Sequence, residues 1–233
     1  MEDIRLQVAR GTAVFEGAQC LRVDFSGEVS DNYIASGSTF SDCKFSTCRW
    51  GGGALGDVPP VTYLGCDFSR ADLRSVGPRF ARFQRCKFVE ARIDNWDAMC
   101  AEFVDCEFVG RIRGAKFSGR PRGFSSTKIE SLRQTNEFRG NDFTRAELVD
   151  CSIFGGIDLD ANLWPTSPDY VIIRSRQTRI ESAKRRLDEL PSDSERAQAA
   201  AVFEVYSRGA FALQPDLLVR RSELAAAAKL LLD

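Results

Sequence analysis

The chain of 233 residues carries 32 lysines and arginines against 33 aspartates and glutamates, and its sequence pI is near 5.8. This balance argues against a general nucleic-acid-binding surface, and an apolar content of 43% suffices for a core. The chain contains no histidine, which excludes Ser–His and Cys–His nucleophile pairs. No apolar run approaches ~18 residues and no signal-like segment opens the chain, so we expect a cytoplasmic protein that does not span a membrane.

Residues 1–12 fit no repeat, and we expect them to cap the repeats that begin after them, because the end of a stacked repeat exposes apolar core and strand edges. From Ala13 a period of five begins. A column of mostly large residues recurs every fifth position, and a column of mostly small residues runs two positions before it. The match is poor over Glu28–Ala35, which predicts either an outward bulge or Tyr33 packed beside a small neighbour.

Gly51 to Pro60 interrupts the period, since Trp50 and Tyr63 are not separated by a multiple of five. Glycine runs and Pro-Pro are typical of turns, so we predict a loop near 51–60, inserted at a corner. A phosphate-binding role for Gly51–Gly53 is the weaker interpretation, because no phosphate-cradling motif surrounds these glycines.

The repeat is cleanest between Val61 and Phe108, where similar residues recur every 20 positions. The large column reads Tyr63, Phe68, Leu73, Pro78, Phe83, Phe88, Ile93, Ala98, Phe103 and Phe108. The small column includes Cys66, Ala71, Ala81, Cys86, Ala91, Ala101 and Cys106. Neither a helical nor a strand period produces this pattern, and a strict short repeat predicts a solenoid. Four fives give one four-sided coil, with successive coils about 4.8 Å apart.

Segments such as Cys66–Ser75 resemble the pentapeptide-repeat family, whose unit is small–polar–Leu/Phe–polar–polar. The resemblance covers residues 13–164 and implies an all-β solenoid, a right-handed four-sided parallel β-helix. We expect about six coils.

Beyond Phe108 the period changes twice. Near Arg111 it slips by one, because the unshifted phase would bury Arg111 and Arg113, whereas the shifted one buries Ile112 and Phe117. A second, basic loop is predicted near 118–135. The period then resumes with inward pairs at Asn136/Phe138, Asn141/Phe143, Ala146/Leu148 and Cys151/Ile153. Another slip gives the pairs Ile157/Leu159 and Asn162/Trp164.

The C-terminal part, 165–233, is predicted to be a helical region. The first helix would bury Ile180, Ala183, Leu187 and Leu190 and end at Pro191. A capping box at Ser192 and Glu195 would open a second helix with Ala197, Ala201, Val205 and Tyr206 inward, ending near Gly209. A third would begin at Pro215, with apolar Leu217, Leu218, Leu224, Ala225, Ala228 and Leu231 either mediating a homodimer or packing on the last coil.

Eight cysteines are present, and we interpret them as reduced core residues. Cys43, Cys48, Cys66, Cys86, Cys106 and Cys151 lie in the small column, and Cys20 lies in the large one. Free cysteine packs as a small hydrophobe. Cys100, outside both columns, is the one candidate for an exposed thiol. Without a CxxC pair or histidine, we expect no metal site, and we expect no cofactor.

No catalytic residue can be assigned, so surface binding is the predicted activity. The favoured hypothesis is a non-enzymatic scaffold that binds a protein partner through its loops and helical tail. Candidate contacts are basic: Arg120, Arg122, Lys128, Arg179, Arg185 and Arg186, although a solvated helix face is the simpler interpretation of the last three.

The alternative is suggested by a resemblance to the quinolone-resistance branch of the family, which also has two loops, the second longer, and a helical C-terminus. That resemblance implies a DNA mimic that binds DNA gyrase or topoisomerase IV, protects it from quinolones, and dimerises through its C-terminus. Residues 1–165 hold about 23 acidic and 21 basic side chains, whereas a DNA mimic needs one clearly acidic face.

Overall fold

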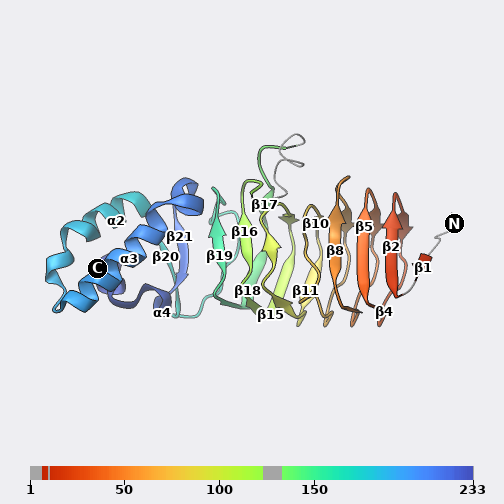
Figure 1. Cartoon of the computed structure of the whole chain (residues 1–233), viewed down its shortest axis with the longest axis horizontal. Helices are drawn as coiled ribbons and strands as arrows, with labels where there is room; N and C mark the ends of the chain where they lie inside the picture. The colour runs from red at the N-terminus through yellow and green to blue at the C-terminus, as the bar shows by residue number, and fades with distance from the viewer. Residues whose placement is uncertain (1–6, 10, 123–132, 233) are drawn as a thin grey trace. The chain divides into compact units, whose positions relative to one another are not determined.

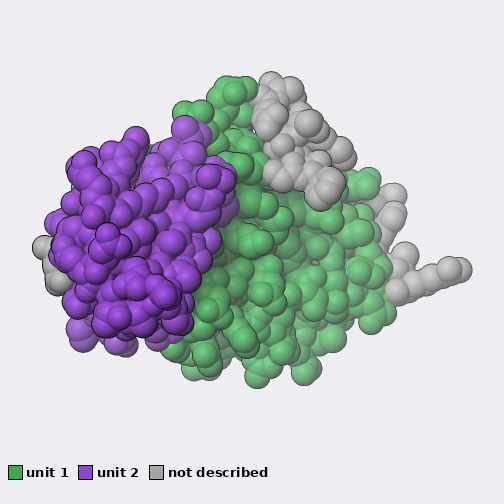
Figure 2. All heavy atoms as spheres, turned by 60° about the vertical axis from the view of Figure 1, so that its left-hand side comes forward, with its two compact units in different colours: residues 1–152, 160–165 green, residues 153–159, 166–233 purple. Residues whose placement is uncertain are grey.

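A computed structural model describes residues 7–9, 11–122 and 133–232. The chain divides into two compact units, coloured separately in Figure 2. The solenoid unit comprises 1–152 and 160–165, and the helical unit comprises 153–159 and 166–233. The division into units does not follow the predicted boundary at 164/165 throughout, because residues 153–159 are grouped with the helical unit. That domain boundary therefore stays a prediction. No helix among the described residues is long and apolar enough to cross a membrane.

The solenoid unit is built from short strands of successive coils that stack side by side, as the period of five predicted (Figure 1). One parallel sheet of six strands takes one strand from each coil, in agreement with the expected six coils. Its strands are β3 (Gln19–Leu21), β6 (Thr39–Ser41), β9 (Thr62–Leu64), β10 (Arg82–Gln84), β14 (Glu102–Val104) and β17 (Phe138–Arg139).

Other faces of the coils carry smaller sheets. One consists of β1 (Gln7–Ala9), β2 (Thr12–Glu16), β5 (Asn32–Ser36) and β8 (Gly53–Asp57), in which only β1 is antiparallel. Another consists of β11 (Lys87–Val89), β12 (Ile93–Asp94), β15 (Glu107–Arg113) and β18 (Asp142–Val149). β4 (Val29–Ser30) and β7 (Arg49–Trp50) form a parallel two-stranded sheet. β13 (Asp97–Ala98) and β16 (Lys116–Ser118) are parallel neighbours in a three-stranded sheet. β19 (Ser152–Phe154) begins in the solenoid unit and ends in the helical unit.

Stacked rings fill the centre of the coils. The ring centroid of Phe88 lies 5.2 Å from that of Phe68 and 4.9 Å from that of Phe108, with the planes nearly parallel. The full column is Phe25, Phe45, Phe68, Phe88, Phe108, Phe143 and Trp164. Offset stacking and burial of aromatic rings are the main stabilising contributions that this repeat can make.

The small column supplies hydrogen-bond donors at the corners of the coils. The Cys66 thiol donates to the Phe40 carbonyl at 3.3 Å, and Cys86 repeats this with Tyr63 at 3.3 Å. Equivalent bonds are made by Cys43, Cys48, Cys106 and Cys151. Burial raises the pKa of the Cys48 thiol to about 12. All eight cysteines are free thiols.

The predicted loop near 51–60 is wrong in part, because Gly53–Asp57 forms β8 and stays in the coil. Pairing with β5 shifts by one residue after Ile34, so one extra residue is taken up as a bulge, and Leu55 is fully buried. A Cβ on Gly53 would lie 1.9 Å from the Tyr33 carbonyl oxygen, so glycine is required there. The coil that contains β8 is longer than 20 residues, since Phe40 pairs with Tyr63 of the next coil. The additional residues are accommodated by the bulge in β8 and by the turn around Pro59.

The poorly matching Glu28–Ala35 region adopts the second alternative. Tyr33 points inward between the small residues Ala13 and Gly53 of the neighbouring coils, so the volume is conserved. Its hydroxyl lies 3.1 Å from that of Tyr63, which in turn donates to the Leu55 carbonyl at 2.8 Å. The buried polar group therefore has a partner, as buried hydroxyls require.

The predicted slip near Arg111 is confirmed. Ile93 pairs with Ile112 and Ala98 with Phe117, one position short of 20, and the side chains of Arg111 and Arg113 are exposed.

The predicted N-terminal cap can be compared with the structure only over Gln7–Ala9. Gln7–Ala9 forms an antiparallel strand on β2, whereas Met1–Leu6 and Arg10 lie outside the described residues.

The helical unit combines helices with a two-stranded antiparallel sheet, β20 (Tyr170–Ile173) and β21 (Leu217–Arg220). Its helices are α2 (Arg176–Arg185), α3 (Asp193–Ser207), α4 (Arg221–Leu224) and α5 (Ala228–Leu231), with 3₁₀ turns η1 (Leu187–Glu189), η2 (Gly209–Leu213) and η3 (Ala225–Ala227). Ile173, Ile180, Phe203, Leu217, Leu224 and Leu230 lie in one buried core.

Two predictions for this unit are wrong. Leu217–Arg220 is a strand and not the start of a helix. Leu217, Leu224 and Leu231 are buried in the unit's own core, whereas Leu218 and Ala228 are half-buried and Ala225 is exposed, so a homodimer through this segment stays a prediction. On α3, Ala197, Ala201 and Val205 are exposed, whereas Ala199 and Phe203 are buried. The predicted start of α3 is confirmed, because the Ser192 hydroxyl accepts a hydrogen bond from the Glu195 amide at 3.2 Å.

Candidate functional site

The predicted partner-binding residues occur in both units. Arg120 is exposed and Arg122 half-buried where the second loop leaves the solenoid, and Lys128 lies outside the described residues. On α2, Arg179 and Arg185 are exposed. Arg186 donates to both carboxylate oxygens of Glu189.

The basic residues of α2 do not form one stripe. At 100° per residue, Arg179 and Arg186 share a flank, whereas Arg185 lies about 100° away from them. Glu181 and Asp188 are also exposed on this segment. The mixture matches the simpler interpretation of a solvated helix face.

The base of the second loop is the most elaborate polar site of the solenoid unit. Asn136, which ends the loop, is buried and donates through Nδ2 to the carbonyls of Met99 at 2.8 Å and Ser118 at 2.9 Å. Its amide donates to the Gly119 carbonyl at 2.9 Å. Because these bonds join both ends of the loop to the preceding coil, they fix where the loop starts and where it returns.

Glu102 is the buried carboxylate at the centre of this base. It accepts hydrogen bonds from Nη1 of Arg82 and Nη1 of Arg133, each at 3.1 Å, and from the Glu137 amide at 2.9 Å. Arg133 also donates to Asn136 Oδ1 at 3.1 Å. A buried carboxylate requires such partners, since an unpaired one would be strongly destabilising.

The charges at this base shift one another's pKa values. Burial lowers the pKa of Arg133, although Glu102 acts in the opposite direction. Burial also acts to lower the pKa of Arg82, but its hydrogen bonds to Glu137 and Glu102 outweigh burial and leave that pKa raised. The hydrogen bond from Arg82 holds the pKa of Glu137 below its ordinary value. These shifts favour the charged forms of Arg82 and Glu137, whereas burial disfavours the charged form of Arg133.

Cys100 belongs to the same site, and its predicted exposure is wrong. The side chain is only 6% exposed, packs against Phe80, and donates through Sγ to the Arg122 carbonyl at 3.2 Å. Cys100 is off both inward columns of the period, but the loop covers this corner of the coil. Sequence reasoning could have found Arg82, Glu102 and Glu137, since all three occupy the position just before an inward phenylalanine.

Outside this base, two columns of adjacent outward residues mix acidic and basic side chains. One reads Asp24, Lys44, Asp67, Lys87, Glu107 and Asp142, in which the sign alternates up to the last two residues, both acidic. A second reads Arg49, Asp72 and Arg92. Asp72 accepts two bonds from Arg74 and lies 3.6 Å from Arg92. Exposed pairs of this kind contribute little stability, but together they leave these two columns without a continuous acidic surface.

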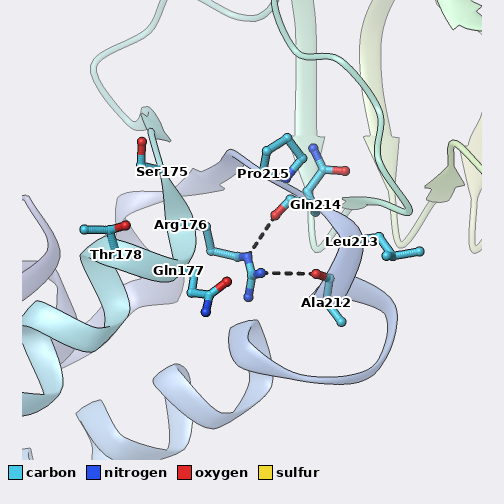
Figure 3. A pocket seen from close by; sticks show the side chains of 8 residues that line it. All are labelled: Ser175, Arg176, Gln177, Thr178, Ala212, Leu213, Gln214 and Pro215. Atoms are coloured by element: carbon cyan, nitrogen blue, oxygen red, sulfur yellow. Dashed lines mark hydrogen bonds between the residues drawn. The ribbon is translucent and has the colours of Figure 1, made fainter.

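The helical unit contains a hollow of about 310 Å³ beside the start of α2, shown in Figure 3. Arg176 is buried there and donates to the carbonyls of Gln214 at 2.8 Å, Tyr206 at 2.7 Å and Ala212 at 3.2 Å. The arginine thus joins three backbone segments of the unit. The lining residues are Ser175, Arg176, Gln177, Thr178 and Ala212–Pro215, which include no pair of nucleophile and base.

Comparison with known proteins gives little beyond the fold. No family model and no curated protein match the chain. Among solved structures, full-length QnrB1, a plasmid-mediated fluoroquinolone resistance protein, is 16% identical and covers 66% of this chain and 82% of its own, with a TM-score of 0.25. A trypsin-treated variant of QnrB1 is 17% identical, covers 67% of this chain and 84% of its own, and has a TM-score of 0.25.

These similarities are too low to support an inference about function. The resemblance to pentapeptide-repeat proteins rests on this chain's own coils, with their faces of five residues and a phenylalanine column inside. At the level of fold it is confirmed.

Proposed function

We propose that this pentapeptide-repeat-like solenoid is a non-catalytic scaffold that binds a protein partner through its second loop. The supporting observation is the cluster of the buried Glu102 with the half-buried Arg82 and Arg133 at the base of that loop. Removing a carboxylate and parts of two guanidinium groups from water has a desolvation cost, and other corners of the coils are built without it. Binding residues are often carried on loops that a rigid scaffold positions, and such a cluster would position this one.

The partner surface we propose is acidic. Arg120 is exposed and Arg122 half-exposed beside the base, and Arg120 is held there by hydrogen bonds of its backbone to the Ser118 hydroxyl at 3.2 and 2.7 Å. Arginine forms bidentate bonds with carboxylates and is common in protein interfaces. Eight free thiols are consistent with the reducing cytoplasm in which we place this interaction.

Protection of a topoisomerase by DNA mimicry is less well supported. Duplex DNA presents regularly spaced negative charges, whereas the two outward columns of this solenoid described above contain basic as well as acidic residues. A supercoiling assay with purified DNA gyrase, with and without a quinolone, tests this alternative. We expect no change in supercoiling at micromolar protein, and a change would favour mimicry over the scaffold.

The scaffold proposal is tested by removing the loop while keeping the coil. Phe103 pairs with Phe138, so deletion of 120–134 restores a spacing of 20 between them. Glu102→Gln should accompany the deletion, because Arg133 is lost. Proteins that copurify with the tagged full chain are then compared with those bound by this variant, with Arg120→Glu, and with Arg185→Glu as a matched control on α2.

We expect a partner that is retained by the control but lost from the loop deletion and reduced by Arg120→Glu. Circular dichroism of each variant verifies that the coils remain folded. Identical sets of bound proteins with and without the loop would disprove the proposal.

A further inference from the structure

Among the described residues, only one of the four sides at the N-terminal end of the solenoid is covered by a further strand. β1 covers only β2, whereas β3 is the outermost strand of the six-stranded sheet and β4 that of its pair. Within 11–122 and 133–232, no strand pairs with the outer edges of β3 and β4. An unpaired strand edge readily adds another strand.

The hydrogen bonds between the first two coils show which backbone groups this edge presents. The Ala18 carbonyl and the Arg22 amide are bonded to the next coil, so the amide and carbonyl of Leu21, which alternate with them, point away from the sheet. On the opposite side, the carbonyls of Glu28 and Ser30 accept bonds from the next coil, so Val29 also points its backbone groups outward. Leu21 and Val29 therefore each direct one donor and one acceptor to the edge, and no described residue bonds to these groups.

The same two residues are the most exposed large apolar side chains of the first coil. Leu21 is 59% and Val29 61% exposed, whereas their counterparts in other coils are mostly polar. Between them lies Phe25, half-buried, which stacks on Phe45 with one face at 5.0 Å. Apolar side chains beside a free strand edge are typical of a surface to which a further strand binds.

We propose that this open end binds the same end of a second copy of the chain, across a two-fold axis through Phe25. In that antiparallel register Leu21 lies opposite Val29 of the second copy, and Arg22 lies opposite Glu28 of the second copy. The edge is therefore self-complementary, with apolar opposite apolar and cation opposite anion. Leu21 and Val29 both direct their backbone groups outward, as a hydrogen-bonded antiparallel pair requires.

Self-complementarity is what a two-fold interface needs, and each contact then occurs twice. Arg22 is exposed and forms no ion pair with a described residue of its own chain. Glu28 is half-buried and accepts a hydrogen bond from Trp50 Nε1 of its own chain, and its carboxylate keeps further lone pairs with which Arg22 of the second copy can pair. β1 lies on the side formed by β2, where it would hold the two ends apart, so the contact is confined to the three other sides, which carry Leu21, Phe25 and Val29. This small area predicts a weak, concentration-dependent dimer.

Sedimentation velocity of the full-length chain over about 1 to 100 µM tests the proposal, since weak interfaces dissociate in this range. We expect the wild-type chain to shift from monomer to dimer. Leu21→Asp and Val29→Lys should each raise the dissociation constant roughly tenfold or more, because each places a charge opposite an apolar residue twice. Both positions are exposed, so both variants should fold.

An equimolar mixture of the two variants gives the sharper result. In the mixed dimer the introduced aspartate faces the introduced lysine, and the other contact keeps Val29 opposite Leu21, so dimerisation should return. Val205→Lys, on the exposed face of α3, is the control and should leave the dissociation constant unchanged.

A wild-type chain that stays monomeric would overturn the proposal, and this includes the case in which residues 1–6 cover the edge. A dimer that persists in both variants, or a mixture that fails to reassociate, would also overturn it. The inference does not depend on the loop function proposed above, because the loop is unchanged in all of these variants.

Discussion

In the solenoid unit, an inward ring stacks on rings about 20 positions away in the sequence, whereas in the helical unit core residues come from helices and strands with no common period. Phe68, Phe88 and Phe108 illustrate the first case, and Ile173, Phe203 and Leu224 the second. The difference teaches that a repeat specifies the burial of each side chain through its neighbours above and below. Without a repeat, burial depends on contacts that local sequence does not encode.

The largest expected effect comes from the ring column. Phe88→Ala should lower the free energy of unfolding by about 3–5 kcal/mol, because it leaves a cavity between two stacked rings that a rigid coil cannot close by relaxation. Denaturant unfolding followed by circular dichroism measures it. A change under ~1 kcal/mol would show that Phe88 does not point inward.

A matched pair on α3 tests the second half of the comparison. Phe203→Ala should also cost about 3–5 kcal/mol, whereas Val205→Ala, 59% exposed in the wild type, should stay within about 0.5 kcal/mol. The same denaturant titration applies to both. Equal costs would mean that Phe203 is not the inward residue of α3 and that the face predicted from the sequence is the real one.

A smaller effect is expected at the small column, where asparagine replaces cysteine near the end of the solenoid. Asn141 is fully buried, accepts from the Cys106 amide at 3.1 Å, and donates to the Phe103 carbonyl at 3.0 Å and to Asn162 Oδ1 at 2.9 Å. Asn141→Leu should cost about 1–3 kcal/mol, because it leaves these groups without partners. Cys66→Ala should cost less, since a thiol is a weak donor. The reverse order would show that packing, not hydrogen bonding, selects this column.

The smallest effect is a pH dependence at the loop base. The Glu137 pKa is lowered in the folded state, so its stabilisation is present above the unfolded value near ~4.3 and is lost as the pH falls through the folded value. The side chain is 34% exposed, so we expect less than about 1 kcal/mol. Glu137→Gln should therefore reduce the loss of stability between about pH 7 and pH 3. An unchanged pH profile would exclude this contribution.

Much of the solenoid could be predicted because the period of five assigns most inward residues, including the shifted Ile112 and Phe117. The prediction from the period failed where a strand contains an extra residue, as β8 does near Leu55. A bulge of this kind needs only one suitably placed glycine and leaves no periodic signal in the sequence. Gly53 is typical of a turn in the sequence, but its role in the fold is the close approach to the Tyr33 carbonyl.

For the helical unit, the capping box at Ser192 could be predicted because it is local, whereas the orientation of α3 could not. Alanines at 197, 199, 200 and 201 favour no face, and only Phe203 decides it by packing in the core. Leu217–Arg220 is a strand because Tyr170–Ile173 pairs with it, and that contact spans more than forty positions. Of the candidate site, the sequence predicts only the exposed arginines, since the bonds of Glu102 to Arg133 cross the loop.

The coil that contains β8 is longer than 20 residues, yet the coil after it resumes the same inward column, with Tyr63 paired to Phe83. Alignment between coils is thus set by stacking contacts and not by counting positions along the chain. Foreign peptides of different lengths could therefore be inserted in the turn around Pro59, while the other coils of the solenoid unit keep their register.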